Sequence, residues 1–427
     1  MSNLGWQHLT RSDKEQIVRG VRDGVAYGGP YHVEFYPADR CNISCFFCST
    51  AAIRGTDELP LQRFEELIAE LGTLGTRAIR LAGGGEPLFH RRIADIIRAA
   101  NRAGIRIENV TTNAVLLAGE IADLLLEGAD QITVSLNTAD AQSYGEMMRT
   151  PERNFDRVLQ NVRDLIAARK KTGRRFPEIN LQFLVWRDNY RSIPRMYALA
   201  RELDVDSILF SGLAFLKPEQ EMNDVEVAEM MRLYEEVIRE DEFRRITNIG
   251  SFERDIEGDL GAIIQRLDRE RRSAGIVRRA LNFATRGDSL AAKVRHHLRA
   301  RRDARATQQT ADFDEACVIG WHSMVVRSDG SVAPCCMLQG KSLGNVLRQS
   351  VKEVWYGEPY QAFRNELTRI IGRGDTWSAS DDDHTVESIC ALKGTNLCPM
   401  KSFYFRRDTP FVRALGETFT SIASRAS

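Results

Sequence analysis

Three cysteines close together near the start of the chain constrain this sequence more than any other feature. They form the run Cys41-Asn-Ile-Ser-Cys45-Phe-Phe-Cys48, whose spacing is CxxxCxxC. Thiolates are soft ligands that suit iron–sulfur clusters and zinc. A four-iron cube has one more iron corner than these three thiolates can bind, so one iron would stay open to a substrate. The alternative is a structural zinc site that takes its fourth ligand from elsewhere in the chain.

The cysteine distribution favours metal chemistry over disulfides. The other five cysteines gather near the carboxyl end, at Cys317, Cys335, Cys336, Cys390 and Cys398. Residues 1–13 lack the apolar core of an export signal, so we expect a reducing cytoplasm in which clustered cysteines bind metal. The net charge is zero and no apolar run is long enough to span a bilayer, which argues against nucleic acid and membrane as partners of the whole chain.

From residue 32 onward the hydrophobic pattern alternates between strands and helices, after a first helix over residues 11–23. The strands are predicted over residues 32–36, 78–81, 105–110, 132–136, 179–185 and 207–210. Six βα-type steps predict an α/β fold with a parallel sheet and right-handed crossovers. Such a sheet places its chemistry at the carboxyl ends of the strands, and the cysteine loop follows the first of them.

Glycine-rich and polar turns follow the next strands. The run Gly83-Gly84-Gly85-Glu86 comes after the second strand, and Ser135-Leu-Asn137 comes after the fourth. Glycine allows close approach of the backbone to a ligand, and polar groups at strand ends suit a sugar. Each turn taken alone is also explained as an ordinary glycine turn or strand-end cap.

Together these motifs resemble the radical S-adenosylmethionine (radical SAM) superfamily, in which an aromatic residue such as Phe47 precedes the last cysteine. The resemblance implies a partial (β/α)6 barrel with a 4Fe–4S cluster on the first three cysteines. It also implies SAM contacts from Phe47, Gly83, Gly84, Gly85, Glu86, Ser135, Asn137 and Arg149.

The resemblance assigns a part to most of these SAM contacts. The glycine motif would meet the SAM amino group, much of it through backbone carbonyls. Ser135 and Asn137 would bind the ribose, and Arg149 would pair with the methionine carboxylate. Arg149 is otherwise a surface arginine. His90 is a candidate acid, although a structural residue at the start of the following helix is the favoured interpretation.

The carboxyl-terminal motifs resemble a SPASM/twitch extension. In order they are Cys317, a hairpin with Asp-Gly at residues 329–330, Pro-Cys-Cys at 334–336, Gly-Asn at 344–345, Trp355 and two late cysteines. Four cysteines suffice for one auxiliary 4Fe–4S cluster. The predicted ligands are Cys317, Cys335, Cys390 and Cys398, with Cys336 as a substitute for Cys335. Structural zinc is the alternative here too.

The predicted organisation is a lead-in over residues 1–30, a radical SAM core over 31–215, a helical charged linker over 216–312, a small α+β SPASM/twitch-like domain over 313–400 and a tail over 401–427. Residues 266–305 hold 13 Lys and Arg against 4 Asp and Glu, which suits an anionic partner such as RNA. A solvated linker is favoured, because Phe283 is the one aromatic residue there that could stack on a base.

The resemblance implies an enzyme that cleaves SAM reductively and abstracts hydrogen from a substrate, with flavodoxin or ferredoxin as electron donor. A small polar metabolite of the sugar, aminocyclitol or nucleoside type is the favoured substrate, partly because the short lead-in leaves no room for a leader-peptide-binding domain. A peptide- or protein-modifying maturase is the alternative, and a non-catalytic metal-cluster or RNA-binding module is a third hypothesis. The sequence identifies no substrate-side acid, base or radical partner.

Overall fold

The computed structural model describes residues 8–48, 50–51, 54–212, 222–240, 247–249, 318–336, 338 and 342–373. The strands are β1 (His32–Phe35), β2 (Ala78–Leu81), β3 (Arg106–Thr112), β4 (Gln131–Ser135), β5 (Glu178–Val185), β6 (Ser207–Gly212), β7 (Thr247–Ile249), β8 (Ser323–Val326) and β9 (Val332–Ala333). The helices are α1 (Arg11–Asp23), α2 (Leu61–Leu74), α3 (Ile93–Arg102), α4 (Gly119–Gly128), α5 (Ala141–Met148), α6 (Arg153–Lys171), α7 (Ile193–Leu203), α8 (Asp224–Glu240), α11 (Val351–Trp355) and α12 (Glu358–Arg373).

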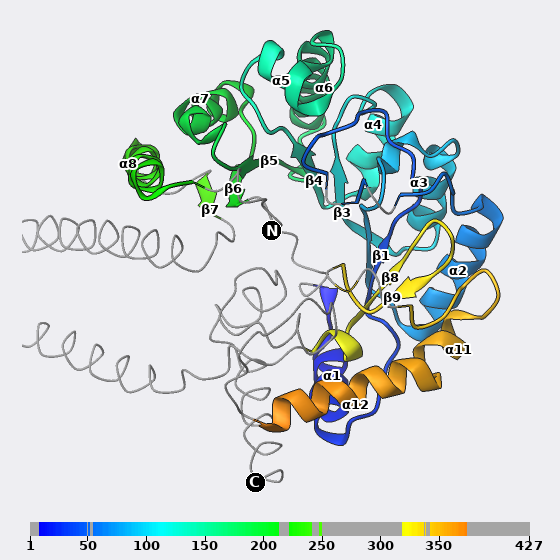
Figure 1. Cartoon of the computed structure of the whole chain (residues 1–427). Helices are drawn as coiled ribbons and strands as arrows, with labels where there is room; N and C mark the ends of the chain where they lie inside the picture. The colour runs from blue at the N-terminus through cyan, green and yellow to red at the C-terminus, as the bar shows by residue number, and fades with distance from the viewer. Residues whose placement is uncertain are drawn as a thin grey trace, which may run out of the picture.

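The described strands form one sheet of nine, in the order β7-β6-β5-β4-β3-β2-β1-β8-β9. Neighbours from β7 to β8 pair in parallel, and β9 pairs with β8 in the antiparallel sense. Figure 1 shows helices α2 to α8 arranged in an arc on one side of the strands. This open, curved sheet with helices outside is consistent with the predicted partial barrel, and the six predicted strands lie within two residues of their expected bounds.

Local rules explain the helix ends. α1 covers the residues that the sequence predicted, because Thr10 and Asp13 form a capping box at its start. Gly24 ends it in the left-handed conformation at φ 72°. The Asp13 carboxylate also accepts from Arg77 Nε at 2.9 Å, which ties α1 to the segment before β2.

The sheet extends past residue 215, where we predicted the barrel core to end. Helix α8 leads to β7, which pairs in parallel with β6, so the sheet has one strand more at this edge than the alternation predicted. Three residues are too few to reveal a period of two, which is why the sequence did not show β7. The rest of the predicted linker lies outside the described residues, and the division of the chain into domains stays a prediction.

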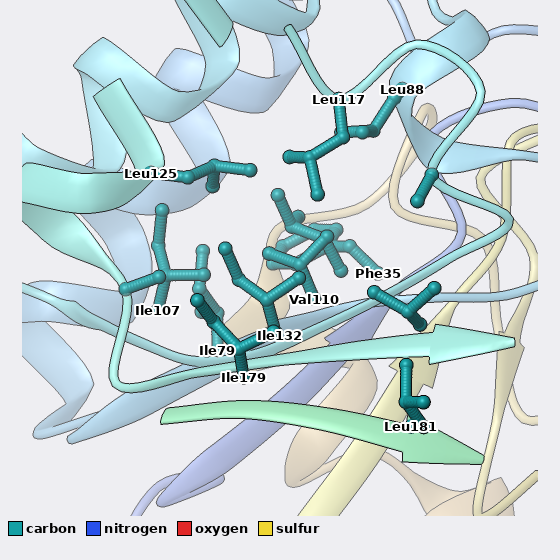
Figure 2. Close-up of a cluster of buried hydrophobic side chains, with 14 of the residues drawn as sticks. Phe35, Ile79, Leu88, Ile107, Val110, Leu117, Leu125, Ile132, Ile179 and Leu181 are labelled. Carbon is teal, nitrogen blue, oxygen red and sulfur yellow. The ribbon is translucent and has the colours of Figure 1, made fainter. Parts of the chain in front are cut away.

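The main hydrophobic core lies between the sheet and its helices. Alternate residues of β5 are fully buried and half-buried, as expected for a sheet whose two faces differ. The apolar side chains shown in Figure 2 come from successive parallel strands and from the helical layer: Phe35, Ile79, Leu88, Ile107, Val110, Leu117, Leu125, Ile132, Ile179 and Leu181. This packing holds the strand ends, and therefore the loops after them, in place.

The carboxyl-terminal segment joins the same sheet instead of standing apart. The predicted Asp-Gly hairpin is confirmed as β8 and β9, and β8 pairs with β1. Next to it, α11 docks on α2, where Arg63 donates to the carbonyls of Val346 at 2.6 Å and Gln349 at 3.0 Å. Among the helices of the described residues, none has the length and apolar character to cross a bilayer.

Candidate functional site

The cysteine loop begins directly after β1, at the carboxyl end of the sheet. Cys41, Cys45 and Cys48 are free, half-buried thiols. The end of α5 holds the loop, since Ser44 N–H donates to the Met148 carbonyl at 3.0 Å. The Met148 thioether also lies 3.3 Å from the Cys45 sulfur. A soft, buried sulfur environment therefore surrounds the middle cysteine.

Burial favours the protonated thiol at Cys41 and Cys45 when no metal is bound. Burial, followed by the charges of Cys41 and Cys48, raises the pKa of Cys45 to about 12. Burial also raises the pKa of Cys41, and the negative charge of Glu86 acts in the same direction. Cationic iron would remove the penalty on the thiolates, so metal binding here releases protons.

The glycine loop after β2 packs against the segment that leads to the cysteines. A Cβ on Gly83, whose φ is 119°, would lie 2.1 Å from the Tyr36 ring. A Cβ on Gly85 would lie 2.1 Å from the Arg40 carbonyl oxygen. Glycine is therefore required by contact with the chain itself, in addition to any approach of a ligand. This contact keeps the two loops side by side at one edge of the sheet.

Glu86 is the buried centre of the site. Its Oε1 accepts from the Thr112 hydroxyl at 2.6 Å and from Leu88 N–H at 3.1 Å, and its Oε2 accepts from Asn113 N–H at 2.8 Å. Burial raises the pKa of Glu86 to about 7, although the three donors favour the charged form. The sequence predicted a SAM contact for this residue. The structure shows a carboxylate that joins the loops after β2 and β3.

Two polar side chains reach the cysteine sulfurs. Thr50, which is 9% exposed, lies 3.2 Å from the Cys48 sulfur and donates to the Gly84 carbonyl at 2.7 Å. Asn113 Nδ2 lies 3.8 Å from the Cys41 sulfur. Hydrogen bonds to ligand sulfurs tune the potential of an iron–sulfur cluster. Sequence reasoning missed Thr50, for which its position two residues after the last cysteine was the available signal.

An aromatic group flanks the loop on the side of β5. Phe47 packs on Trp186 with ring centroids 5.1 Å apart, and Phe46 packs on the same indole at 5.6 Å. Trp186 directly follows β5 and is fully buried. The structure places Trp186 beside the predicted SAM contact Phe47. The tryptophan itself was not predicted.

The residues predicted to bind the ribose and the methionine carboxylate of SAM differ in their burial. Ser135 ends β4 and is half-buried. Asn137 is 2% exposed, and its Oδ1 accepts from Leu184 N–H at 2.8 Å. Arg149 is exposed and caps α5 in the left-handed conformation at φ 47°. All three lie at or after the end of β4 in the chain, and their contacts with SAM stay predictions.

His90 is held in a structural position. Its Nε2 lies 2.9 Å from the Leu59 carbonyl, to which it donates, and its Nδ1 accepts from Arg92 N–H at 3.0 Å. Burial lowers the pKa of His90, which keeps the imidazole neutral. These contacts favour the structural interpretation over a catalytic acid.

The second cysteine set is described only in part. Cys335 packs against the main core and acts electrostatically on Tyr360. Cys336 lies instead near Tyr36 and Arg80, where the negative charge of its thiolate raises the pKa of both side chains. The two neighbours therefore lie in different surroundings, and which of them is a ligand stays a prediction. Three predicted ligands lie outside the described residues: Cys317, Cys390 and Cys398.

The donors of the first site fit the cluster that the sequence predicted. Three soft thiols come from one loop, and each has a polar or sulfur neighbour that could orient it. Within the described residues, no three His, Cys, Asp or Glu side chains are grouped to hold a single metal ion. A 4Fe–4S cube does not need such a group, because each thiolate binds its own iron.

Comparison with protein families finds two matches in this chain. Residues 35–176 match the radical SAM superfamily, and residues 317–390 match SPASM, an iron–sulfur cluster-binding domain. The first match contains the cysteine loop, the glycine loop and strands β2 to β4. The two domains imply 4Fe–4S clusters and SAM as cofactors.

Curated relatives match the amino-terminal part. A GTP 3′,8-cyclase of Chlorobaculum tepidum is 32% identical over 200 residues, which are 46% of this chain and 57% of that protein. A probable GTP 3′,8-cyclase of Sulfurisphaera tokodaii is 31% identical over 169 residues, which are 39% of this chain and 51% of that protein. The chain thus spans about half the length of these relatives.

Solved structures share the fold at low identity. Streptococcus suis SuiB bound to S-adenosylmethionine has a TM-score of 0.55 at 17% identity, over 82% of this chain and 71% of that one. The anSMEcpe structure with bound AdoMet has a TM-score of 0.52 at 15% identity, over 93% of this chain and 100% of that one. At such identities the likeness concerns the fold alone.

Proposed function

We propose that this chain, a member of the radical SAM superfamily with a C-terminal SPASM domain, reductively cleaves SAM to a 5′-deoxyadenosyl radical that abstracts hydrogen from a substrate. The observation that carries the proposal is the meeting of two loops at one sheet edge. Three free thiols follow β1, and the glycine loop packs beside them after β2. A bound cluster would supply the electron, and an open iron corner would bind SAM.

The chain's own residues would hold SAM and shape the site. Cys41, Cys45 and Cys48 would bind three irons. The backbone of the glycine loop would meet the SAM amino group, with Glu86 holding that loop against Asn113. The predicted contacts Phe47, Ser135, Asn137 and Arg149 would complete the site. The buried Trp186, with the half-buried Phe47 ring packed on it, would help to exclude water from it.

The direct test is SAM cleavage by anaerobically reconstituted protein. With dithionite, or with reduced flavodoxin or ferredoxin, we expect methionine and 5′-deoxyadenosine from the wild type. We expect neither product from Cys45→Ala. Zinc in place of iron at this loop, or unchanged cleavage by the variant, would contradict the proposal. Iron and sulfide without any cleavage would favour the non-catalytic module.

The favoured substrate is a small polar metabolite. The curated relatives named as GTP 3′,8-cyclases support it, because a nucleotide is the substrate in that name. A polar network on one face of the sheet supports it too: Arg80 Nη2 donates to the Thr111 hydroxyl at 2.9 Å, and the buried Asn109 donates through Nδ2 to the Thr133 hydroxyl at 2.9 Å. Such hydroxyl and amide groups could also bind a polyhydroxylated ligand.

A peptide substrate is the second candidate. One matching structure is SuiB bound to its precursor peptide SuiA, with a TM-score of 0.55. The two candidates separate in a deuterium assay with SAM and either deuterated nucleosides and sugars or a deuterated peptide library. Deuterium in 5′-deoxyadenosine identifies the class that donates the hydrogen atom. Label from peptides alone would overturn the metabolite proposal.

A further inference from the structure

Asp39 connects the cysteine loop to the carboxyl-terminal hairpin. It lies between β1 and Cys41, and its Oδ2 accepts from Gly55 N–H at 3.1 Å. Its Oδ1 accepts from the Ser328 hydroxyl at 2.5 Å. Ser328 lies in the turn between β8 and β9 and is 2% exposed. One carboxylate therefore joins segments that are 289 residues apart in the sequence.

The same carboxylate lies against the glycine loop. A Cβ on Gly84 would come within 3.0 Å of Asp39 Oδ1, the oxygen that Ser328 also contacts. A Cβ on Gly85 would lie 2.4 Å from the Asp39 carbonyl oxygen. A displacement of Asp39 would therefore move the loop that is proposed to hold the SAM amino group.

Both partners of this bond lie close in sequence to a predicted cluster ligand. Asp39 precedes Cys41 by two residues, and Ser328 precedes Cys335 by seven. Between Ser328 and Cys335 the chain is held by the pairing of β9 with β8, and β8 pairs with β1. The linkage therefore runs through hydrogen-bonded strands, which transmit a displacement better than an unpaired loop does.

A charge-assisted bond in this setting is strong. A hydroxyl that donates to an ionised carboxylate forms a shorter bond than one that donates to a neutral acceptor. Because Ser328 is shielded from water, its hydroxyl would lose its acceptor if Asp39 moved away. Movement of either segment is thus coupled to the other.

We propose that Asp39 is a positioning residue that couples occupancy of the SAM site to the carboxyl-terminal hairpin. The inference rests on the proposed function, since it takes the glycine loop as the SAM site. SAM bound to that loop restrains Gly84 and Asp39, and through Asp39 it restrains Ser328. Linkage is reciprocal, so release of the hairpin from Asp39 must weaken SAM binding by the same factor.

The test compares two serines of one hairpin. Ser331 forms a similar bond, at 2.6 Å, but to Asp329 within the hairpin and at an exposed position. SAM affinity is measured by equilibrium dialysis on anaerobically reconstituted protein. We expect Ser328→Ala to weaken SAM binding about fivefold or more, which is the lower range of measured couplings. We expect Ser331→Ala to leave SAM affinity unchanged. We expect Ser328→Thr, which keeps the hydroxyl, to retain the wild-type affinity.

A second readout follows the hairpin itself. In the wild type, SAM should slow amide hydrogen exchange over residues 328–333, and in Ser328→Ala that protection should disappear. If Ser328→Ala does not fold, Asp39→Asn replaces it, because an amide offers one acceptor oxygen to two donors. The combined variant should be no weaker in SAM binding than the worse single variant.

Three results would overturn the coupling. They are wild-type SAM affinity in Ser328→Ala, equal effects of the two serines, and additive effects of Asp39→Asn and Ser328→Ala. Wild-type protein that binds no SAM would overturn the proposed function together with the coupling. Wild-type protein that binds and cleaves SAM, with an affinity indifferent to Ser328, would overturn the coupling alone.

Discussion

The two cysteine sets of this chain are assembled in different ways. The first lies within eight residues, from Cys41 to Cys48, in a loop held by neighbouring strand-end loops and by α5. The second extends from Cys317 to Cys398, and its described members reach their place because β8 pairs with β1. A local set can be recognised from spacing alone. A dispersed set depends on the strand pairing that brings its parts together.

The largest expected effect separates the two sets by function. Cys45→Ala should abolish SAM cleavage and lower iron from about eight to about four atoms per chain, since one 4Fe–4S cluster is lost. Cys335→Ala should lower iron to the same extent and still allow 5′-deoxyadenosine formation, because the SAM-binding cluster remains. Iron analysis and chromatography of the products measure both. Equal loss of SAM cleavage in the two variants would contradict separate functions for the two cysteine sets.

The next effect concerns the two adjacent cysteines. Cys335 packs on the main core, whereas Cys336 lies near Tyr36 and Arg80 and affects their pKa values. We therefore expect that only one of the two cysteines binds the auxiliary cluster. We expect Cys335→Ala to lose the auxiliary cluster and Cys336→Ala to retain it. Iron content and the absorption band of the cluster provide the measurement. The reverse result would make Cys336 the ligand.

A smaller effect distinguishes the first site by its pH dependence. Burial raises the pKa of Glu86 from 4.5 to about 7, so the folded protein binds the Glu86 proton more tightly than the unfolded chain does. This tighter proton binding stabilises the folded protein by about 3 kcal/mol, since a change of one in pKa corresponds to about 1.4 kcal/mol. The stabilisation is complete below pH 4.5 and is lost as the pH rises through 7.

Glu86→Gln removes this proton and supplies the comparison. We expect the thermal midpoint of the wild type to fall relative to the variant between about pH 5 and about pH 8. Parallel curves for the two proteins would show that Glu86 does not titrate in this range. Glu120→Gln, at an exposed carboxylate of α4, is the matched control and should follow the wild type.

The smallest effect concerns the docking of the carboxyl-terminal segment. Arg63 donates to two carbonyls that precede α11 and is 17% exposed. Arg63→Ala should lower stability by about 1–2 kcal/mol, because both carbonyls lose a charged donor. Arg102→Ala, at an exposed pair with Glu65, should change the thermal midpoint little. Equal effects of the two variants would contradict a specific docking role for Arg63.

The candidate site shows how much of its structure could be predicted from the residue pattern. The spacing of the cysteines and the glycines after β2 predicted which loops meet, because parallel strands end at one edge. It did not predict Thr50, Trp186 or Asp39, whose parts depend on contacts with distant segments. It also did not show that the Glu86 carboxylate binds the loop after β3.

By itself, the sequence determined the alternation of strands and helices, the cysteine loop at the end of β1 and the Asp-Gly hairpin, because each depends on residues close together in the chain. Only the tertiary structure decided that β8 extends the sheet beside β1 and that Ser328 reaches Asp39. Strand pairing at a sheet edge is set by the backbone groups that an edge leaves open. Nearly all residues carry the same backbone N–H and C=O groups, so the residue pattern does not predict which strand pairs at that edge.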